Sequence, residues 1–369
     1  MAKVLVTAQQ RGSVNAVVGV VPILKSRGHT VEVYATGNDN EVAGFNGVGY
    51  KRIIDLNMEM ARGIIKGYDV LVTGLSGHET ADGYFIMAAN QEGIKNIGVN
   101  DQDGNYVDRF GTSCDGLPTL IAQMNEGCLE TMSRDLPEEM AKDAISRARV
   151  IGWTAYDSFS KMRDEFTDEK KLETLRSAGL KPDERVYFHA TQNVPGTGHF
   201  GYEVRAAEEI MRLASDIGLK LSIKPHPRED GGRFSDTLAK RYGHNFIVAN
   251  SCATSDLVLS SDVVTAGRST VLNEACLLGV NTGGIFQPVM DRELGEKLEF
   301  YGDLWRSFPP ISSGAIPYAI ESEDIAGILR ELSSEDKDVL NNLSENRKKF
   351  SVDGKASERL ANLVDEVLN

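Results

Sequence analysis

Short apolar runs alternate with helical segments along this chain, and that alternation constrains the fold more than any other feature. In the first 160 residues the apolar runs lie at 4–7, 31–34, 69–73, 97–100 and 150–152. Helical patterns lie between them, at 15–26 and 81–91. A strand followed by a helix and a second strand is the βαβ unit, so the pattern predicts a parallel sheet with helices on its faces.

The same pattern starts again in the second half of the chain. Behind a charged helix and linker over 164–183, further strands are predicted at 185–190, 219–224, 246–248, 263–264 and 282–285. A chain of 369 residues is long for one hydrophobic core. We therefore expect an α/β protein with two Rossmann-like, doubly wound domains, at 1–160 and 161–369, joined near 160–182. The last helix of the charged stretch 335–369 is a candidate to pack back on the N-terminal domain.

The composition excludes several classes of partner and site. The net charge is −14, and an acidic surface disfavours nucleic acid and anionic lipid, so we expect no nucleic-acid partner. The four cysteines are far apart and form no CxxC pair, which argues against a zinc site or a disulfide framework. Scattered thiols fit a reducing compartment. Cys276 lies in an apolar helical run, where we expect it to pack in the core.

The sequence carries no membrane or export signal. No run approaches the ~20 apolar residues of a membrane-spanning helix, and the strand at 4–7 follows the first residues without a signal-peptide pattern. We therefore expect a cytoplasmic protein with no integral membrane segment. The oligomeric state is not readable from the sequence, and a homodimer is left open.

The most informative stretch for function is 261–280. A strand ends in a tight turn at Gly267, and Ser269 and Thr270 then stand at the start of a helix. Exposed N–H groups and the positive end of the helix dipole make such a point a natural phosphate site. Glu274 lies about one turn further in, from where its carboxylate could accept hydrogen bonds from two ribose hydroxyls. The alternative is that Ser269 or Thr270 is only an N-cap and Glu274 a solvated helix residue.

This stretch resembles the C-terminal motif of GT-B glycosyltransferases and of UDP-N-acetylglucosamine 2-epimerases. Their shared pattern is a strand, a turn of small residues, and a helix that carries Glu-Ala and ends in Leu-Gly. The resemblance implies a GT-B fold with its two domains facing a central cleft. It assigns Gly267, Ser269 and Thr270 to the diphosphate and Glu274 to the ribose. Arg268 departs from the small residue usual in the turn, and it would either contact a phosphate or fill the pocket.

Other segments agree with this resemblance. Residues 24–31 resemble the end of the first helix of many GT-B enzymes, a structural role that argues against a catalytic His29. Residues 152–157 resemble the G-x-x-x-x-D crossing into the C-terminal domain. The Lys-Pro-His-Pro at 224–227 resembles a motif of capsule and teichoic-acid type transferases. Because Lys224 and His226 follow a strand end, where open α/β sheets bind ligands, they are candidates to bind a phosphate. A polar turn stiffened by two prolines is the alternative.

A formal GxGxxG lies at 196–201, between a strand and a helix. Alone it suggests a dinucleotide fold. Its first glycine comes several residues after the strand, however, and the next strand ends at Lys224 and His226 with no acidic residue for a ribose. We interpret 191–198, with Thr191 and Gln192, as a phosphate or sugar loop instead, and a plain surface loop remains the alternative.

The N-terminal half supplies candidate catalytic groups after three strands. In the loop 9–13, Arg11 could neutralise a leaving diphosphate, and Gly12 would let the backbone approach closely. His78 is a candidate general base, because imidazole titrates near working pH. Asp101 or Asp103 could deprotonate an acceptor hydroxyl or hold an imidazole in place. The two also form a DxD, but we expect no metal, because Asp-rich segments ending in Gly are common turns and the GT-B resemblance implies helix dipoles and side chains instead.

Three hypotheses for the function follow. The first is an inverting, metal-independent glycosyltransferase without a cofactor. Its nucleotide-diphospho-sugar, a UDP-sugar for preference, would bind the C-terminal domain, and an unknown acceptor the N-terminal domain. The second is a UDP-N-acetylglucosamine 2-epimerase, which needs several N-terminal carboxylates and usually a paired Glu-Glu where this chain has Asn273-Glu274. The H-R-R-E-N type loop of those epimerases is also replaced here, at 190–193. The third is a nucleotide-sugar binding protein without catalysis.

Overall fold

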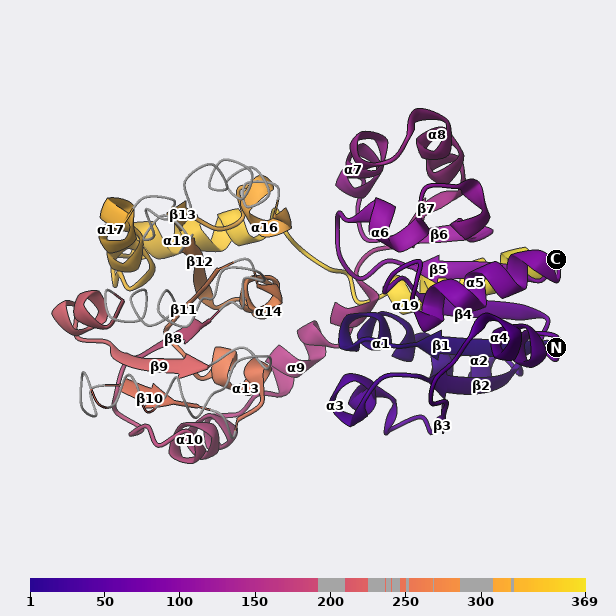
Figure 1. The fold of residues 1–369 in the computed structure, drawn as a ribbon. Helices are drawn as coiled ribbons and strands as arrows, with labels where there is room; N and C mark the ends of the chain where they lie inside the picture. The colour runs from indigo at the N-terminus through magenta and orange to yellow at the C-terminus, as the bar shows by residue number, and fades with distance from the viewer. Residues whose placement is uncertain are drawn as a thin grey trace. The chain divides into compact units, whose positions relative to one another are not determined.

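The chain forms two compact units. The computed structural model describes residues 1–191, 210–224, 236, 240, 246–249, 252–267, 269–285, 308–319 and 322–369. Met1–Ser158 and Val352–Asn369 make up the first unit, and Phe159–Ser351 make up the second (Figure 1). The crossing between units therefore comes just before the charged helices that the sequence suggested as a linker.

The first unit is built on a seven-stranded parallel sheet. Its strand order is β3-β2-β1-β4-β5-β6-β7, with β1 paired to both β2 and β4. The strands are β1 (Lys3–Ala8), β2 (Thr30–Ala35), β3 (Lys51–Arg52), β4 (Val70–Gly74), β5 (Lys95–Val99), β6 (Leu120–Gln123) and β7 (Ala148–Val150). The chain winds outward first on one side of β1 and then on the other. The switch point of this Rossmann order, where such sheets bind ligands, is between β1 and β4.

Successive side chains of a strand point to opposite faces of the sheet, and each face packs in its own apolar core. Val4 and Val6 point to a core shared with α1, α2 and α19, whereas Leu5 points to a core shared with α4 and α5. The described helices of the unit are α1 (Arg11–Val18), α2 (Val20–Ser26), α3 (Asp39–Val42), η1 (Ala43–Phe45), α4 (Met58–Ile65), α5 (Ala81–Gln91), α6 (Tyr106–Phe110), η2 (Cys114–Gly116), α7 (Gly127–Asp135), α8 (Glu138–Arg147), η3 (Thr154–Tyr156) and α19 (Ala356–Leu368).

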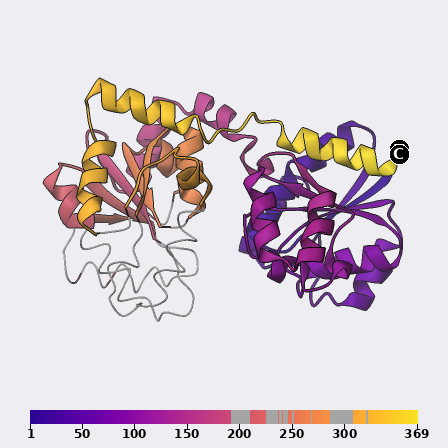
Figure 2. The ribbon, with the colours of Figure 1, turned by 90° about the horizontal axis from the view of Figure 1, so that it is seen from above.

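The C-terminal helix α19 completes the first unit. Figure 2 shows it lying along the unit that also holds the N-terminal segments. Leu360 and Val364 are fully buried in the shared core. The carboxylate of Asp157 accepts hydrogen bonds from the N–H groups of Ala356 and Ser357, at 3.0 and 2.6 Å. The acidic residue of the 152–157 segment therefore binds the start of α19.

A second contact holds the far end of α19. Asp365 pairs with Arg27 at 2.6 Å and with His29 Nε2 at 3.0 Å. Both partners lie between α2 and β2, so His29 has a structural partner in this unit. The hydrogen bonds of Arg27 and His29 lower the pKa of Asp365, against the effect of burial, which is the largest single cause and would raise it.

The second unit repeats the same winding. Six parallel strands lie within the described residues of this unit, in the order β10-β9-β8-β11-β12-β13, so the switch point is between β8 and β11. The strands are β8 (Val186–Ala190), β9 (Lys220–Lys224), β10 (Phe246–Val248), β11 (Val263–Ala266), β12 (Asn281–Ile285) and β13 (Tyr318–Ala319). The helices whose two ends lie within the described residues are α9 (Phe159–Glu165), α10 (Asp168–Ser177), α13 (Thr254–Leu259), α14 (Thr270–Leu278), α16 (Pro309–Ser312), α17 (Ser322–Leu332) and α18 (Lys337–Arg347), and residues 210–216 are also helical. The prediction of two doubly wound parallel sheets is confirmed.

Two local predictions are corrected by the structure. The predicted helix 15–26 is two helices, α1 and α2, which meet at Gly19. The segment 9–13, predicted as a loop, contains the start of α1, so Arg11 and Gly12 are helical. The reason is local: the hydroxyl of Ser13 accepts the N–H of Gln10 at 3.2 Å, and this bond closes the first turn.

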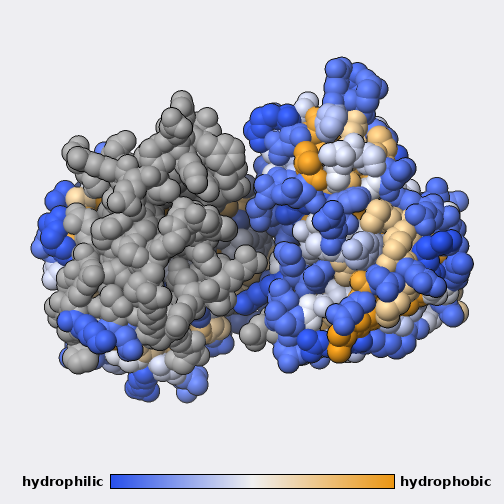
Figure 3. Space-filling view, in the orientation of Figure 1, coloured by the Kyte–Doolittle hydropathy of each residue, from blue (hydrophilic) through white to orange (hydrophobic). Residues whose placement is uncertain are grey.

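The outer surface is mainly polar where it can be followed. The face of the first unit in Figure 3 is largely hydrophilic with small hydrophobic areas. Ile54, Met60 and Val150 are among the exposed large apolar side chains. No helix within the described ranges is long and apolar enough to cross a membrane.

Candidate functional site

The loops that follow β1 and β4 meet at the switch point of the first sheet. Ser13 on α1 and Ser76 in the loop after β4 lie with their hydroxyl oxygens 2.9 Å apart. A Cβ at Gly74 would overlap the side chain of Ser13, so only glycine fits at the end of β4. The side chain of Gln9 accepts the N–H of Ala81, at 2.8 Å, and thereby satisfies the first turn of α5.

A buried acid, Asp82, lies beneath these two serines. It belongs to the first turn of α5 and is 1% exposed. Its Oδ2 accepts the hydroxyl of Ser76 at 2.5 Å and the N–H of Ser76 at 3.2 Å, whereas no described atom bonds Oδ1. Burial raises the pKa of Asp82 to about 6. The Asp101 carboxylate adds to that rise, and the hydrogen bonds from Ser76 and Ser13 oppose it.

Asp101, at the end of β5, is held by an arginine. Its Oδ1 lies 2.9 Å from Nη1 of Arg109, a guanidinium that is only 8% exposed. The same guanidinium donates to the carbonyl of Leu75 and, at 3.2 Å, to that of Gly104. A Cβ at Gly12 would overlap the Asp101 carboxylate. The structure therefore brings two of the predicted site residues, Gly12 and Asp101, into contact.

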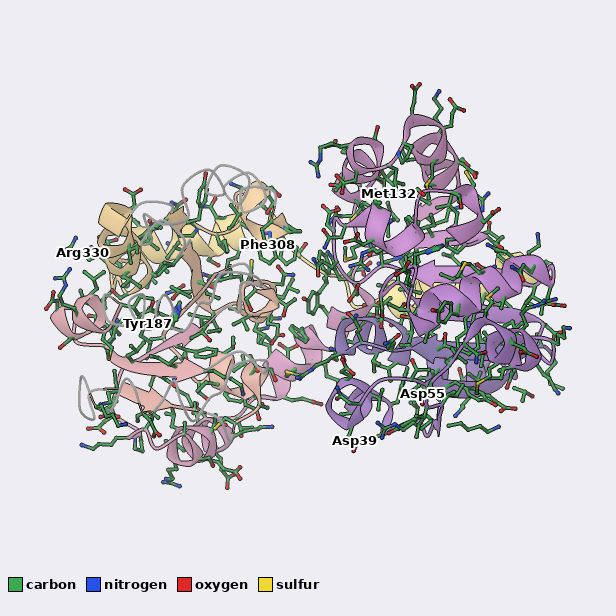
Figure 4. The ribbon with its side chains drawn as sticks, in the orientation of Figure 1. Asp39, Asp55, Met132, Tyr187, Phe308 and Arg330 are labelled. Atoms are coloured by element: carbon green, nitrogen blue, oxygen red, sulfur yellow. The ribbon has the colours of Figure 1, made fainter. Side chains whose placement is uncertain are left out.

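Asp103 binds different partners from Asp101. Its two oxygens accept hydrogen bonds from the hydroxyls of Tyr106, at 3.2 Å, and Thr131, at 3.1 Å. Tyr106 is completely buried, and Thr131 lies on α7, the helix on which Figure 4 labels Met132. Burial raises the pKa of Asp103, against these two hydrogen bonds. Asp103 thus ties the loop after β5 to α6 and α7.

His78 and Arg11 border the same edge. The backbone N–H of His78 donates to the carbonyl of Asp108 at 2.7 Å. Its ring lies so close to Gly111 and Gly116 that a Cβ at either glycine would press on it. Arg11 is exposed, at the first position of α1.

In the second unit, the predicted phosphate turn lies at the end of β11. Gly267 is buried, and its carbonyl accepts the N–H of Ser269 at 2.9 Å. The hydroxyl of Ser269 accepts the N–H of Val271 at 3.3 Å, so Ser269 is the N-cap of α14. Thr270 is exposed at the first helical position, and Glu274 is half-buried one turn further along.

Thr191 and Lys224 lie beside this turn, at the ends of the adjacent strands β8 and β9. The N–H of Thr191 donates to the carbonyl of Lys224 at 3.1 Å, and the Lys224 ammonium donates to the carbonyl of Cys252. The strands β8, β9 and β11 are neighbours, so the structure gathers Thr191, Lys224 and Gly267 at one edge. The predicted site residues Gln192, His226 and Arg268, and the GxGxxG at 196–201, lie outside the described residues.

A cluster of three buried polar side chains lies within the sheet behind this edge. Tyr187, labelled on β8 in Figure 4, has its hydroxyl 2.5 Å from Oγ1 of Thr265, and Nδ1 of His189 lies 2.9 Å from the same atom. All three side chains are fully buried. Burial lowers the pKa of His189 to about 3, so its imidazole is neutral at physiological pH.

Sequence reasoning missed the group formed by Ser13, Ser76, Asp82 and Arg109. An acid inside the otherwise apolar stretch 81–89 was the one signal for Asp82, because a charged residue on an apolar helix face needs a reason to be buried. Arg109 gave no signal, since its partner comes from another loop. Among the described residues, no group of three His, Cys, Asp or Glu could hold a metal ion.

Comparison with known proteins gives structural likeness only. Comparison of the sequence with protein-family models and with curated proteins finds no match. Among solved structures, S. aureus MnaA in a co-structure with UDP is 16% identical, with a TM-score of 0.70 over 100% of this chain and 97% of that one. UDP-GlcNAc 2-epimerase from Neisseria meningitidis, bound to UDP-GlcNAc, is 13% identical, with a TM-score of 0.72 over 99% and 100%.

A transferase gives a similar result. The wall teichoic acid polymerase TagF is 15% identical, with a TM-score of 0.60 over 99% of this chain and 88% of that one. At identities this low, the structural similarity establishes the fold and leaves the activity open. The fold of this chain is therefore of the GT-B type, shared with solved epimerases and glycosyltransferases.

Proposed function

We propose that this protein is an enzyme that uses a nucleotide-diphospho-sugar, a UDP-sugar for preference, and that it transfers the sugar to an acceptor with inversion and without a bound metal. The observation that carries the proposal is the turn from β11 to α14. Gly267, the cap residue Ser269 and Glu274 follow one another there, in the order of the GT-B motif that this stretch resembles.

The physical case for the donor rests on charge. A helix N-terminus presents unpaired N–H groups and a positive dipole end, which favour an anion. Lys224 adds a cation at the same edge, and no acidic residue stands in the described turn. The carboxylate of Glu274, one helical turn away, can accept hydrogen bonds from two ribose hydroxyls. Positive groups here would also stabilise the diphosphate as it departs.

The first unit would hold the acceptor. Transfer forms a bond between the acceptor oxygen and the anomeric carbon and breaks the bond from that carbon to the diphosphate, which leaves with the electron pair. The acceptor proton must go to a base. The sequence predicts His78 or Asp101 as this base. The structure adds Asp82, a buried acid at the same edge, as a third candidate.

The second candidate is a 2-epimerase. Three aspartates follow β4 and β5 in the first unit, and that chemistry needs carboxylates near the sugar. Proton abstraction at C2 and anti-elimination of the nucleotide would then replace transfer. Fold likeness favours this candidate over the first, because the solved epimerase from Neisseria meningitidis matches with a TM-score of 0.72 and the teichoic acid polymerase with 0.60.

One experiment separates the two. The protein is incubated in D2O with UDP-N-acetylglucosamine and with a set of other UDP-sugars, and the products are followed by NMR and mass spectrometry. A transferase releases UDP only when an acceptor is supplied and leaves C2 unlabelled, whereas an epimerase incorporates deuterium at C2 of UDP-N-acetylglucosamine. The incubation is repeated with a set of sugar and polyol acceptors. Absence of deuterium at C2 contradicts the epimerase, and binding of UDP without turnover of any UDP-sugar in the presence of these acceptors contradicts the transferase and leaves a binding protein. Glu274→Ala should abolish the reaction, and the matched surface variant Glu345→Ala should not.

A further inference from the structure

Asp82 can exchange a proton with a substrate only through another side chain. Its side chain is buried, at 1% exposure, between α5 and the loop after β4. Ser76 is half-buried and donates its hydroxyl to the Asp82 carboxylate at 2.5 Å. Ser76 is therefore the accessible member of the pair, and Asp82 the member behind it.

The hydrogen bonds around the pair suit both protonation states of the acid. With Asp82 ionised, Ser76 donates to it, and Ser13 can donate to Ser76. With Asp82 protonated, the chain reverses: Asp82 donates to Ser76, Ser76 donates to Ser13, and Ser13 donates to the carbonyl of Gln10 at 2.9 Å. Hydroxyl groups are donors and acceptors at once, so a proton can move along this chain without leaving a donor unpaired.

The other acids of this edge are less suited to receive a proton. Asp101 is already bound by the Arg109 guanidinium, with Nη1 2.9 Å from its Oδ1. Asp103 already accepts from Tyr106 and Thr131. Asp82 has no cation bound to it among the described residues, and its Oδ1 accepts no hydrogen bond from them.

We propose that Ser76 and Asp82 form the proton relay of the enzyme, in which Ser76 touches the acceptor hydroxyl and Asp82 receives its proton. The proposal rests on the proposed function and names the base within it. The acceptor O–H gives its proton to Oγ of Ser76 while the Ser76 hydroxyl proton passes to Oδ2 of Asp82. The acceptor oxygen bonds to the anomeric carbon, and the diphosphate leaves with the electrons of the broken bond.

Burial is the main cause of the raised pKa of Asp82, and it acts beside nearby charged and titratable groups. They are Asp101 from the end of β5 and, paired with it, Arg109 from α6, while His78 lies in the same loop as Ser76. Burial raises the pKa of Asp82 to about 6, so it is mostly ionised at neutral pH and able to accept a proton.

The first part of the test observes Asp82 without substrate. The chain is labelled with ¹³C at the aspartate carboxyl carbons, and the signal absent from Asp82→Asn is followed from pH 4 to 8. We expect a midpoint near 6 in the unchanged protein and a higher one in Ser76→Ala, which loses hydrogen bonding to the ionised form. A midpoint below 5, or one that Ser76→Ala leaves in place, would overturn the relay.

The second part measures release of UDP from UDP-N-acetylglucosamine and the other UDP-sugars in the presence of the same set of sugar and polyol acceptors. We expect Asp82→Asn and Ser76→Ala each to lower kcat by at least ~100-fold, the usual contribution of a positioned base. Ser76→Thr keeps the hydroxyl and should restore most of the rate. The acid limb of the kcat–pH profile should disappear in Asp82→Asn. Two control variants, Asp69→Asn at the other end of β4 and Ser222→Ala in the second sheet, should keep both the rate and the profile.

The two levels of the proposal fail in different ways. If the unchanged protein turns over a UDP-sugar and Ser76→Ala is as fast with the same pH profile, the relay is wrong and the proposed function stands. If no UDP-sugar is turned over and UDP does not bind, the proposed function is wrong, and the relay falls with it. A purely structural role for the pair would lower the melting temperature of Ser76→Ala and leave the kcat of the folded fraction unchanged.

Discussion

The two sheets share one strand order but carry opposite chemistry at their switch points. In the first unit the loops after β1, β4 and β5 bring together the buried Asp82 with serines and the half-buried Asp101 with Arg109. In the second unit the ends of β8, β9 and β11 offer a glycine turn, hydroxyls and Lys224. An acid-lined edge suits proton transfer, whereas a helix N-terminus with a nearby cation suits an anion. The winding of a sheet fixes where a site forms, and the loop residues decide what it does.

The first unit needs a segment from the far end of the chain, residues 352–369, whereas the second unit is continuous in sequence. Removing residues 352–369 should therefore have the largest effect of the changes considered. The first unit would lose Leu360, Leu363 and Val364 from its core, at roughly 1.5–3 kcal/mol each. That is comparable with the whole stability of a domain, so the first unit should unfold. Hydrogen exchange should show β1 and β4 unprotected and β8 and β9 still protected. Equal protection in both units would contradict this account of α19, and removal of Asn369 alone is the control.

The buried titratable groups should give the two units opposite responses to pH. Asp82 has a folded pKa of about 6 against 3.8 unfolded, so its proton stabilises the fold at low pH, and about 3 kcal/mol is lost as the pH rises from about 3 to 7. His189 has a folded pKa of about 3 against 6.5 unfolded, so the second unit should lose about 3 kcal/mol as the pH falls from 7 to 4.

Variants of these two residues test the assignment. Asp82→Asn should flatten the pH dependence of hydrogen exchange in the first unit alone, and His189→Gln that in the second unit alone. If either variant alters the pH response of the other unit instead, the attribution to that buried group is wrong.

The contact of Gly12 with Asp101 can be tested with a pair of glycine variants. A Cβ at Gly12 would overlap the Asp101 carboxylate, so Gly12→Ala should cost about 1–3 kcal/mol and disturb the acid edge. Gly63→Ala, within α4, meets no atom within 4 Å and should stabilise the helix by up to about 1 kcal/mol. Thermal unfolding of both variants measures the difference. Equal effects would show that the Gly12 contact is loose.

The smallest expected effect concerns the cap of α14. Ser269→Ala should cost about 1 kcal/mol, as should Thr167→Ala at the cap of α10 in the same unit. Only Ser269→Ala should also weaken UDP binding, measured by calorimetry. If both variants bind UDP equally well, Ser269 is a helix cap and nothing more.

The sequence predicted the elements whose residues carry their own signal. The strands β1, β4 and β8 are continuous apolar runs because they are buried on both faces, and α5 was predicted at its observed bounds. The strands β3 and β13 are two residues each, too short for any pattern, and they form only because a neighbouring strand accepts them. The sequence predicts a loop at the start of α1, because its glycine and polar residues mask a first turn that Ser13 closes.

The geometry of the candidate sites was predictable where it depends on one segment and hidden where it depends on several. Gly267, Ser269 and Glu274 are close in sequence, so their turn could be recognised. Asp82 gained its surroundings from α1 and from the loop after β4, contacts that no local pattern encodes. The same holds for α19, whose start is bound by Asp157 about 200 positions earlier.

The central claim is a nucleoside diphosphate site at the turn from β11 to α14, and nucleotide-dependent thermal shift tests it most directly. The protein is melted with UDP, GDP, CDP, ADP, dTDP and NAD, with and without magnesium. A ligand at ~100 times its Kd adds ~2.7 kcal/mol of stability. We predict that one nucleoside diphosphate, UDP for preference, raises the melting temperature without magnesium and that Glu274→Ala abolishes the shift. A shift with NAD alone, or with none of the nucleotides, would contradict the claim.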